Sequence, residues 1–309
     1  MSLPLVIYHK QLGDVLLLEP ALARLAAWCG GRVHLATRPG FAPLLGLMAA
    51  VDPIPDGVFR RASQVISFDY RSRACVQALM TWAPVKQLFV MAEKQLRAWQ
   101  ALCFPQGRQI VGEGALYRAE YFFRLVPGGG EFRPPRLAPP PPAWRPESLP
   151  DHPYMLIHAT SAWRNKCWPA EAWAQAIDAL QARGFGPFVV TGGNADWEKE
   201  FVDSMAAATR VPLINLCGRT GLEGYLATIA GAAAVLCIDG SAAHLAAALG
   251  RPTVVMFGPS NPEHWYYPAP HTRLVDARCF VAGKRPPVSA IPGSALVDSA
   301  CELMEKSRG

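Results

Sequence analysis

The sequence predicts an α/β protein made of two domains, each with a parallel sheet covered by helices on both faces. Short apolar runs alternate with helical segments along most of the chain, which is the pattern of repeated βαβ units. A proline-rich stretch interrupts this alternation near the middle of the chain. The chain has 309 residues, of which 51% are hydrophobic, enough for two separate cores.

The first half begins with an apolar strand expected at residues 3–8, followed by a turn at 9–14 and a helix at 15–28. Further strands are expected at 33–36, 65–68, 87–90 and 110–111, and helices at 41–48, 72–82, 92–104 and 115–125.

A segment rich in glycine and proline, residues 127–150, separates the two halves. Its sequence PPRLAPPPPAWRPESLP cannot form a regular helix or a central strand, so we interpret it as a stiff linker. The predicted boundaries are 1–133 for the first domain, 134–150 for the linker and 151–309 for the second. The last helix is left free to pack back on the first domain.

The alternation restarts with a strand at 154–158. A helix expected from Thr220 has Glu223 three residues later, which is the spacing of a capping box. The other strands are expected at 188–191, 213–216, 235–238 and 253–257, and the other helices at 170–183, 197–208, 242–249 and 294–306.

The strand at 235–238 is followed by Asp239-Gly240-Ser241 and then by an alanine-rich helix. In open α/β sheets, ligands bind at the carboxyl ends of strands, and a helix N-terminus there attracts an anion such as phosphate. Gly240 lets the backbone approach a ligand closely, and Ser241 can cap the helix. A turn that only caps the helix and binds nothing explains the same residues.

Charge and cysteine content restrict the class of protein. A formal net charge of +6 favours acidic partners, but the basic residues are scattered, so we expect no nucleic-acid partner. The eight cysteines include no C-x-x-C pair, so we interpret them as reduced core thiols of a cytosolic protein, neither metal ligands nor disulfides.

Targeting signals are not expected. The apolar run at 3–8 is too short for a signal peptide. The longest apolar region, 222–238, contains Glu223 and Gly231, so a helix followed by a strand explains it better than a membrane span does.

Four stretches resemble glycosyltransferase family 9, the ADP-heptose:lipopolysaccharide heptosyltransferases. The most specific is residues 215–265, which follow the family's donor-domain signature almost throughout. The others are LGDVLLLEPAL at 12–22, Lys166-Cys167-Trp168-Pro169 with Trp173 and the upstream pair Thr160-Ser161, and Thr191-Gly192-Gly193 with the acidic residues after it.

The resemblance implies a GT-B fold, in which two Rossmann-like doubly wound domains face each other across a cleft. It also implies an inverting enzyme that needs no metal and no cofactor besides its nucleotide-sugar donor; the chain has no D-x-D motif. Three positions depart from the family. Tyr8 or His9 stands where a basic residue is usual, Glu19 where Thr is frequent, and Asp239-Gly240-Ser241 where D-[ST]-G is usual.

Glycosyl transfer needs a base for the acceptor hydroxyl and donors that stabilise the departing diphosphate. Asp14 is the candidate base, although an aspartate at a helix start is often only a cap. Lys10 and Gly13, in the same turn, are assigned to the acceptor side. Lys166 is the candidate cation for the diphosphate, supported by the N–H groups at Gly240 and Ser241; the plain alternative is a solvated surface lysine.

The remaining candidates belong to the donor site. Asp239 either contacts the sugar, orients the turn, or only caps the helix. Asp196 or Glu198 contacts donor hydroxyls, and the spacing does not separate them from each other or from a solvated helix start. Thr160 and Ser161 are assigned to the nucleotide. His244 is placed with them, although a packed, hydrogen-bonded histidine explains it equally.

One basic and aromatic stretch suggests contact with lipid. Lys94, Arg97, Trp99 and Phe104 form a predicted helix that either touches a lipid surface or is a solvated helix face.

The expected function is transfer of heptose from ADP-heptose to an anionic, lipid-linked inner-core saccharide. We expect a cytoplasmic monomer that contacts the inner membrane peripherally. Two alternatives stay open: a relative that uses another nucleotide sugar, and a nucleotide-sugar-binding scaffold without transfer activity. The presence of both Asp14 and Lys166 argues against the scaffold, which needs no base.

Overall fold

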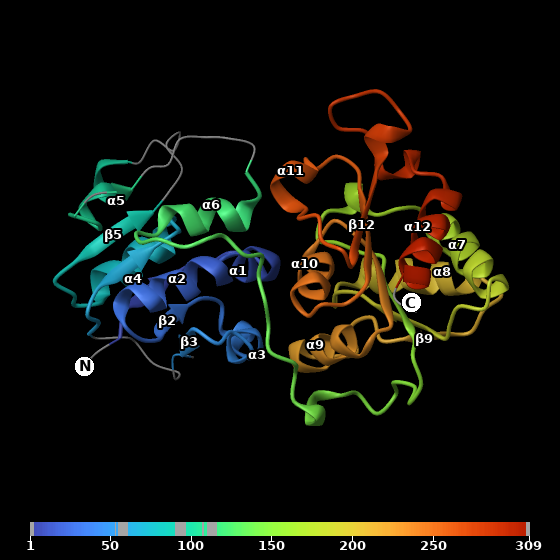
Figure 1. The fold of residues 1–309 in the computed structure, drawn as a ribbon, viewed down its shortest axis with the longest axis horizontal. Helices are drawn as coiled ribbons and strands as arrows, with labels where there is room; N and C mark the ends of the chain where they lie inside the picture. Colours follow the sequence, from blue (N-terminus) through green and yellow to red (C-terminus); the bar gives the residue numbers. More distant parts are fainter. Residues whose placement is uncertain are drawn as a thin grey trace. The chain divides into compact units, whose positions relative to one another are not determined.

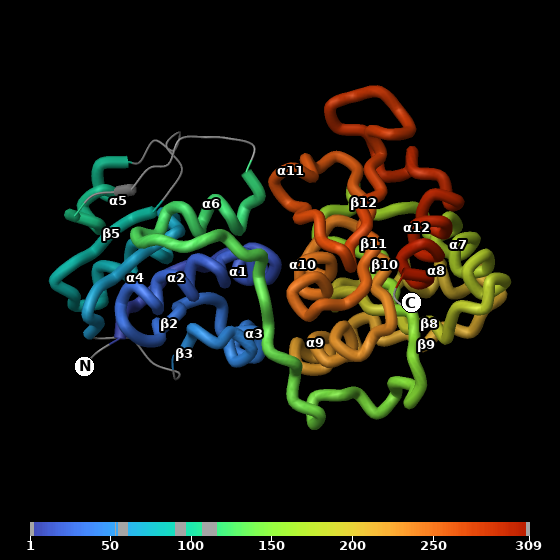
Figure 2. The backbone as a smooth tube through the Cα atoms, in the orientation of Figure 1, coloured from blue at the N-terminus to red at the C-terminus, as the bar shows by residue number. Residues whose placement is uncertain are grey.

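The computed structural model describes residues 3–52, 54, 61–89, 97–106, 108–109 and 116–306. The chain divides into two compact units, Met1–Ala138 and Pro139–Gly309. The division falls inside the predicted linker. Figure 2 shows that each unit is one continuous piece of chain, since the tube passes from the first to the second once.

The first unit contains a six-stranded parallel sheet with the order β3-β2-β1-β4-β5-β6 (Figure 1). This is the strand order of a Rossmann domain, in which the chain starts at the centre and builds outward in both directions. In the register of the sheet, Val6 of β1 lies between Leu35 and Ile66. The strands are β1 Leu5–Ile7, β2 Val33–Ala36, β3 Val51–Asp52, β4 Val65–Ser67, β5 Lys86–Phe89 and β6 Arg108–Gln109.

The helix predicted at 15–28 is in fact two helices that meet at Leu18. The physical cause is Pro20 near the start of the second helix, because proline donates no hydrogen bond to the preceding turn and its ring clashes there. The first of the two already begins at Leu12, so Gly13 and Asp14 lie inside a helix. The helices of this unit are α1 Leu12–Leu17, α2 Glu19–Cys29, α3 Ala42–Gly46 after the 3₁₀ turn η1 Pro39–Phe41, α4 Ser72–Met80, α5 Ala98–Leu102 and α6 Arg118–Leu125.

Several predictions in this unit concern residues outside the described ones. The strand predicted at 110–111 lies there, as does the first part of the helix predicted at 92–104. The described part of that helix is α5, which ends at Leu102.

The predicted linker attaches to both units within its own length. On the first unit, the backbone N–H of Ala138 donates to the carbonyl of Leu47. On the second unit, the 3₁₀ turn η2 Pro142–Trp144 packs against α9, and Leu149 is buried. The segment is therefore irregular, as expected from its prolines, but it is anchored rather than free.

The second unit repeats the same architecture with the strand order β12-β11-β10-β7-β8-β9. Its outermost strand β12 was not predicted; it pairs with β11 over its whole length. The strands are β7 Met155–His158, β8 Phe188–Thr191, β9 Leu213–Asn215, β10 Ala234–Ile238, β11 Thr253–Phe257 and β12 Thr272–Asp276.

The final helix packs against α7, β11 and β12 of the second unit (Figure 1). The helices are α7 Ala170–Ala182, α8 Asp196–Ala208, α9 Leu222–Gly231, α10 Ser241–Ala248, α11 Pro262–Trp265 and α12 Gly293–Lys306. The 3₁₀ turns are η3 Arg164–Lys166, η4 Ala277–Cys279 and η5 Val288–Ala290.

Two predicted caps are wrong. Ser241 is the first residue of α10, not its cap; the N-cap is Gly240, and no side chain caps this helix. The capping box predicted from Thr220 and Glu223 is replaced by a start after Gly221, again without a side-chain cap. These helices are held by packing of their apolar faces, which outweighs the contribution of a single cap.

The tryptophans after Lys166 form part of the core of the second unit. The rings of Trp168 and Trp173 meet edge to face with centroids 5.4 Å apart, and both side chains are buried. Nε1 of Trp168 donates to the carbonyl of Ile291 at 3.1 Å. Trp168 and Trp173 thus connect the segment before α12 to the start of α7. The same contacts hold the 3₁₀ turn η3, which carries Lys166.

All eight cysteines are free thiols, but Cys279 is exposed rather than in the core. Within the described ranges, no helix has both the length and the apolar character needed to cross a membrane.

Candidate functional site

At the centre of the second parallel sheet, the order in which strands are added reverses. β7 pairs with β10 there, with Ile157 opposite Leu236. In open α/β sheets, ligands bind beyond the carboxyl ends of two such strands, where the connections leave toward opposite sides. Thr160 and Ser161 follow β7, and Asp239 follows β10. The predicted donor residues therefore meet at one edge of the sheet.

Lys166 and Asp239 form an ion pair at this edge, with Nζ 2.6 Å from Oδ2. The side chain of Asp239 is 6% exposed and that of Lys166 is 23% exposed. The solvated-lysine alternative is therefore wrong, and the carboxylate of Asp239 binds Lys166 rather than capping α10. An ammonium has three N–H donors, of which this pair uses one.

The backbone at Gly240, where the family usually has Ser or Thr, has room for a Cβ atom. The φ of Gly240 is 178°, an extended conformation that any residue adopts. A Cβ atom added there would meet only the carbonyl oxygen of Ile238, at 3.8 Å. The Cβ atom of Ser or Thr, the usual family residues, thus fits this backbone.

The structure separates the two acidic candidates of α8. Glu198 is buried, and its Oε1 accepts a hydrogen bond from the backbone N–H of Gly193 at 3.1 Å. A Cβ atom on Gly193 would lie 2.1 Å from Oε2 of Glu198, so only glycine permits this approach. Asp196 is fully in solvent, 3.7 Å from Nζ of Lys199. Only Glu198 reaches the carboxyl end of β8.

A buried polar group beside this edge was missed in the sequence. Nδ1 of His158 lies 3.0 Å from Oγ1 of Thr191, and its ring stacks near that of Tyr225 with centroids 5.4 Å apart. Burial lowers the pKa of His158 to about 4, so this histidine is neutral at physiological pH. The available signal was a histidine at the end of an apolar strand, two residues before Thr160.

Oγ1 of Thr160 is buried and has no hydrogen-bond partner among the described residues. Buried polar atoms are nearly always paired, so this hydroxyl at the carboxyl end of a central strand has hydrogen-bonding capacity left for a ligand. His244 lies further along α10, half-buried, with its ring centroid 6.4 Å from that of Trp265.

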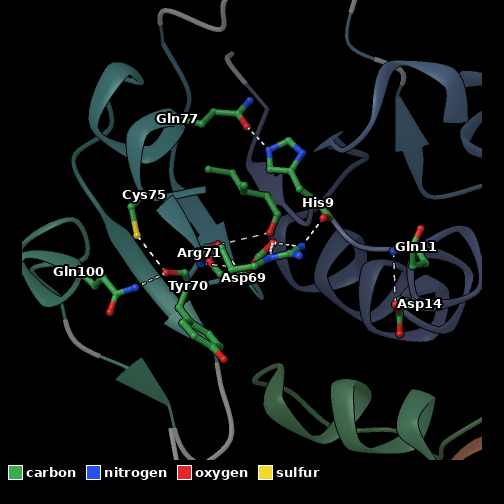
Figure 3. Close-up of polar contacts among 11 residues, drawn as sticks. His9, Gln11, Asp14, Asp69, Tyr70, Arg71, Cys75, Gln77 and Gln100 are labelled. Atoms are coloured by element: carbon green, nitrogen blue, oxygen red, sulfur yellow. Dashed lines mark hydrogen bonds and ion pairs between the residues drawn. The ribbon is translucent and has the colours of Figure 1, made fainter. Parts of the chain in front are cut away.

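The corresponding edge of the first sheet carries Asp14. β1 and β4 pair at its centre, with Ile7 opposite Ser67. Asp14 is half-buried in the first turn of α1, and its Oδ2 accepts from the backbone N–H of Gln11 at 3.3 Å (Figure 3). The proposed base therefore also acts as a cap, and the two interpretations coexist. Gly13 is buried and Lys10 is half-buried beside it.

An ion pair that the sequence did not indicate holds the turn before α1. The guanidinium of Arg71 donates from Nε to both carboxylate oxygens of Asp69 at 3.1 Å, and from Nη2 to Oδ2 at 2.8 Å. Nη2 also donates to the carbonyl of His9, directly before Lys10 (Figure 3). Burial raises the pKa of the Asp69 carboxyl, but hydrogen bonds from Arg71 outweigh it, so the pKa is lowered.

The side chains at the family's usual basic position are packed in this chain. The ring of Tyr8 meets those of Phe68 and Phe122 edge to face, at 6.5 and 5.6 Å. Nε2 of His9 lies 2.7 Å from Oε1 of Gln77, and burial lowers the pKa of His9.

Glu19, the other departure, has a structural partner. It is buried, and Nη1 and Nη2 of Arg133 donate to its two carboxylate oxygens at 2.9 and 2.8 Å. Its Oε2 also accepts from the backbone N–H of Arg136 at 3.1 Å. Glu19 thus fastens the start of the proline-rich segment to α2.

The described part of the chain contains no group of three histidine, cysteine, aspartate or glutamate side chains placed to hold a metal ion.

The chain was compared with known proteins. Residues 140–280 match the model of glycosyltransferase family 9 (heptosyltransferase). This confirms the resemblance, and the match covers the whole edge at which Lys166 and Asp239 meet. Lipopolysaccharide heptosyltransferase 3 of Escherichia coli K12 is 32% identical over 116 residues, which are 37% of this chain and 33% of that protein. The chain spans about a third of the length of the curated relatives it matches.

Solved structures extend the likeness in fold to both units. ADP-heptose lipopolysaccharide heptosyltransferase II of E. coli matches with a TM-score of 0.79 at 18% identity, covering 99% of this chain and 100% of that one. An E. coli heptosyltransferase solved with ADP matches with a TM-score of 0.77 at 19% identity, covering 97% and 99%. The predicted fold class, two Rossmann-like domains of GT-B type, is confirmed.

Proposed function

We propose that the protein is an inverting, metal-independent glycosyltransferase that moves heptose from ADP-heptose to an inner-core lipopolysaccharide acceptor. The observation that carries the proposal is the ion pair of Lys166 and Asp239 at the central strand ends of a family 9 domain. One structural neighbour was solved with ADP, and another is named for ADP-heptose, which supports this donor.

On the donor side, Lys166 neutralises the charge that develops on the departing diphosphate, together with N–H groups at Gly240 and Ser241. Preorganised donors of this kind contribute about 3 to 4 kcal/mol each to a transition state. Asp239 positions the ammonium, because its Oδ2 accepts a hydrogen bond from Nζ of Lys166 at 2.6 Å.

Thr160 and Ser161 are assigned to the nucleotide, and His244 stays with them as a donor-side residue. Glu198 takes the role of accepting donor hydroxyls. Asp196 lies in solvent, so we do not include it in the proposed donor site.

On the acceptor side, Asp14 accepts the proton of the acceptor hydroxyl, with Lys10 and Gly13 beside it. The acceptor oxygen attacks the anomeric carbon from the face opposite the diphosphate. The new C–O bond forms as the bond to ADP breaks, and ADP leaves with the electron pair, so the configuration inverts. This requires the two units to face each other across a cleft. We propose a monomer in the cytoplasm, peripheral at the inner face of the cytoplasmic membrane.

The test begins with a thermal-shift panel of ADP, UDP, GDP and CMP, because a ligand that binds only the native state raises its stability. We expect ADP to raise Tm most. Transfer from ADP-heptose to a deacylated inner-core acceptor is then followed, with the anomeric configuration of the product read by NMR. Preference for another nucleotide would indicate a relative with a different donor sugar. Tight donor binding without transfer to any core acceptor would indicate a scaffold.

A further inference from the structure

The exposed large apolar side chains are concentrated in one part of the first unit. Six of the ten in the described residues lie between positions 76 and 102. Four are more than half exposed on or just after α4, and Leu102 of α5 is 76% exposed. We call this set the α4–α5 face; its members are Val76, Leu79, Met80, Trp82, Trp99 and Leu102. Single exposed apolar residues are ordinary, whereas a concentrated set marks an interaction surface.

The two helices present these side chains from the same side of the sheet. Cys75 and Ala78 of α4 and Cys103, just after α5, are buried in one cluster under the helices. Nε2 of Gln100 in α5 donates to the carbonyl of Tyr70 at 2.8 Å, directly before α4 (Figure 3). The outward residues of both helices therefore belong to one surface.

Basic side chains surround this face. Residues 61–106 contain six basic and two acidic residues, so this part of the chain supplies four units of the formal net charge of +6. Arg61, Arg73 and Arg97 are exposed, whereas the acidic Asp69 is buried and paired with Arg71. The guanidinium of Arg61 lies over the ring of Trp82, 4.7 Å from its centroid.

We propose that the α4–α5 face rests on the surface of an anionic phospholipid bilayer. Exposed leucine and methionine side chains enter the boundary between headgroups and acyl chains, and tryptophan prefers that depth. The surrounding arginines meet the phosphates of anionic lipids. A protein partner of ordinary composition would not need this charge, so charge complementarity selects the bilayer.

The inference rests on the proposed function in one respect: a transferase acting on a lipid-linked saccharide meets its acceptor at a membrane. It also corrects the helix predicted from the sequence. Phe104 is buried in the core and Lys94 lies outside the described residues, so Trp99 and Arg97 alone remain from that set. The larger part of the surface comes from α4.

The test is sedimentation of the full chain with vesicles of phosphatidylcholine alone or with phosphatidylglycerol at about 30% of the lipid. The double variant Leu79→Glu/Leu102→Glu should lower the partition coefficient on anionic vesicles by about tenfold or more. Both side chains are exposed, so the variant should fold. Trp28→Glu is the matched control, because Trp28 is also exposed in the first unit but lies on α2; it should bind as the unmodified protein does.

A second variant tests the charge. Arg73→Gln/Arg97→Gln should reduce binding to anionic vesicles toward the level seen with phosphatidylcholine alone, and added salt should do the same. Equal binding of the unmodified protein to both vesicles, or binding undiminished in the leucine variant, would overturn the proposal. So would self-association that the leucine variant abolishes without any vesicle binding, since the face would then join two copies.

The result is separable from the proposed function. Transfer to a deacylated, water-soluble acceptor and affinity for ADP should be unchanged in the leucine variant, because its substitutions lie away from both strand-end sites. A chain that binds vesicles but neither ADP nor another nucleotide would contradict the proposed function and leave the surface intact.

Discussion

The two sheets of this protein have the same strand order but carry different chemistry at their central strand ends. In the second unit, the edge holds the pair Lys166–Asp239 and an unpaired buried hydroxyl on Thr160. In the first unit, the edge holds the carboxylate of Asp14 and the clamp of Asp69 and Arg71. One edge offers hydrogen-bond donors and a cation, and the other offers a proton acceptor. The comparison teaches that this scaffold fixes where a site lies, whereas a few side chains decide its task.

The largest effect is expected for Asp14→Asn. This variant tests whether one sheet supplies the base for transfer and the other binds ADP. Asp14→Asn keeps the shape of the side chain and the hydrogen bond from Gln11 but removes the proton acceptor. A general base contributes about 10²- to 10⁴-fold, so turnover should fall by that factor. Transfer from ADP-heptose and calorimetric titration with ADP are measured on the same sample. Affinity for ADP should hardly change, and full turnover in this variant would remove Asp14 as the base.

The second prediction concerns the buried histidine of the second unit. The pKa of His158, about 4, lies below its ordinary value of 6.5, so the unfolded chain binds the proton first as pH falls. The neutral His158 therefore makes its full contribution to the free energy of unfolding above pH 6.5. This contribution, up to about 3 kcal/mol, is lost as pH falls toward 4. Urea unfolding at neutral and acidic pH measures the loss. His158→Gln should flatten this dependence, and an equally steep profile in that variant would contradict the assignment.

The third prediction tests the clamp of the first unit. Arg71→Ala frees the carbonyl of His9, which precedes the turn that carries Asp14. Small misplacements of a catalytic group lower turnover by about tenfold to a hundredfold. We expect kcat to fall while KM for the donor stays constant. Arg71→Lys should not restore activity, because an ammonium cannot reproduce the paired contacts to Asp69. A change in donor KM alone would argue against a positioning role.

The fourth prediction tests the cation of the second unit. Lys166→Ala removes a charge-assisted hydrogen bond to the diphosphate and should weaken ADP binding by about tenfold. Lys199→Ala is the matched control, because Lys199 is a half-buried lysine of the same unit whose partner Asp196 lies in solvent. Calorimetric titration should separate the two variants. Equal ADP affinities for them, with both variants folded, would exclude Lys166 from the site.

The smallest effect is expected for a substitution at Gly240, where the family usually has Ser or Thr. Gly240→Ser restores the usual family residue at a position with room for it. Serine is a slightly better N-cap than glycine, so stability should rise by a few tenths of a kcal/mol, about 0.3. ADP affinity should stay the same or rise, as measured by thermal unfolding and titration. Clear destabilisation would show that the backbone requires glycine after all.

Local patterns in the sequence were sufficient for the fold class and for the residues that follow the central strands. The apolar runs predicted the central strands, because buried parallel strands need continuous apolar residues. The turns after those strands directed attention to Asp14 and Asp239. These are short-range features, readable within a few residues of the chain.

The tertiary structure decided which of these residues lie together. Lys166 and Asp239 are 73 residues apart and meet because β7 and β10 are neighbours in the sheet. The sequence could not rank Asp196 against Glu198, since both lie in the first turn of α8; the helix direction turns only Glu198 inward.

The hydrogen bond from Arg71 to the carbonyl of His9, 62 residues earlier, followed no local pattern, and neither did the gathering of α4 and α5 into one apolar face. Both depend on how strands and helices pack across the sheet. The sequence by itself therefore determined where strands end and which side chains stand there. Long-range packing decided the ion pairs and surfaces, because their energy depends on distances between segments that only the folded chain brings together.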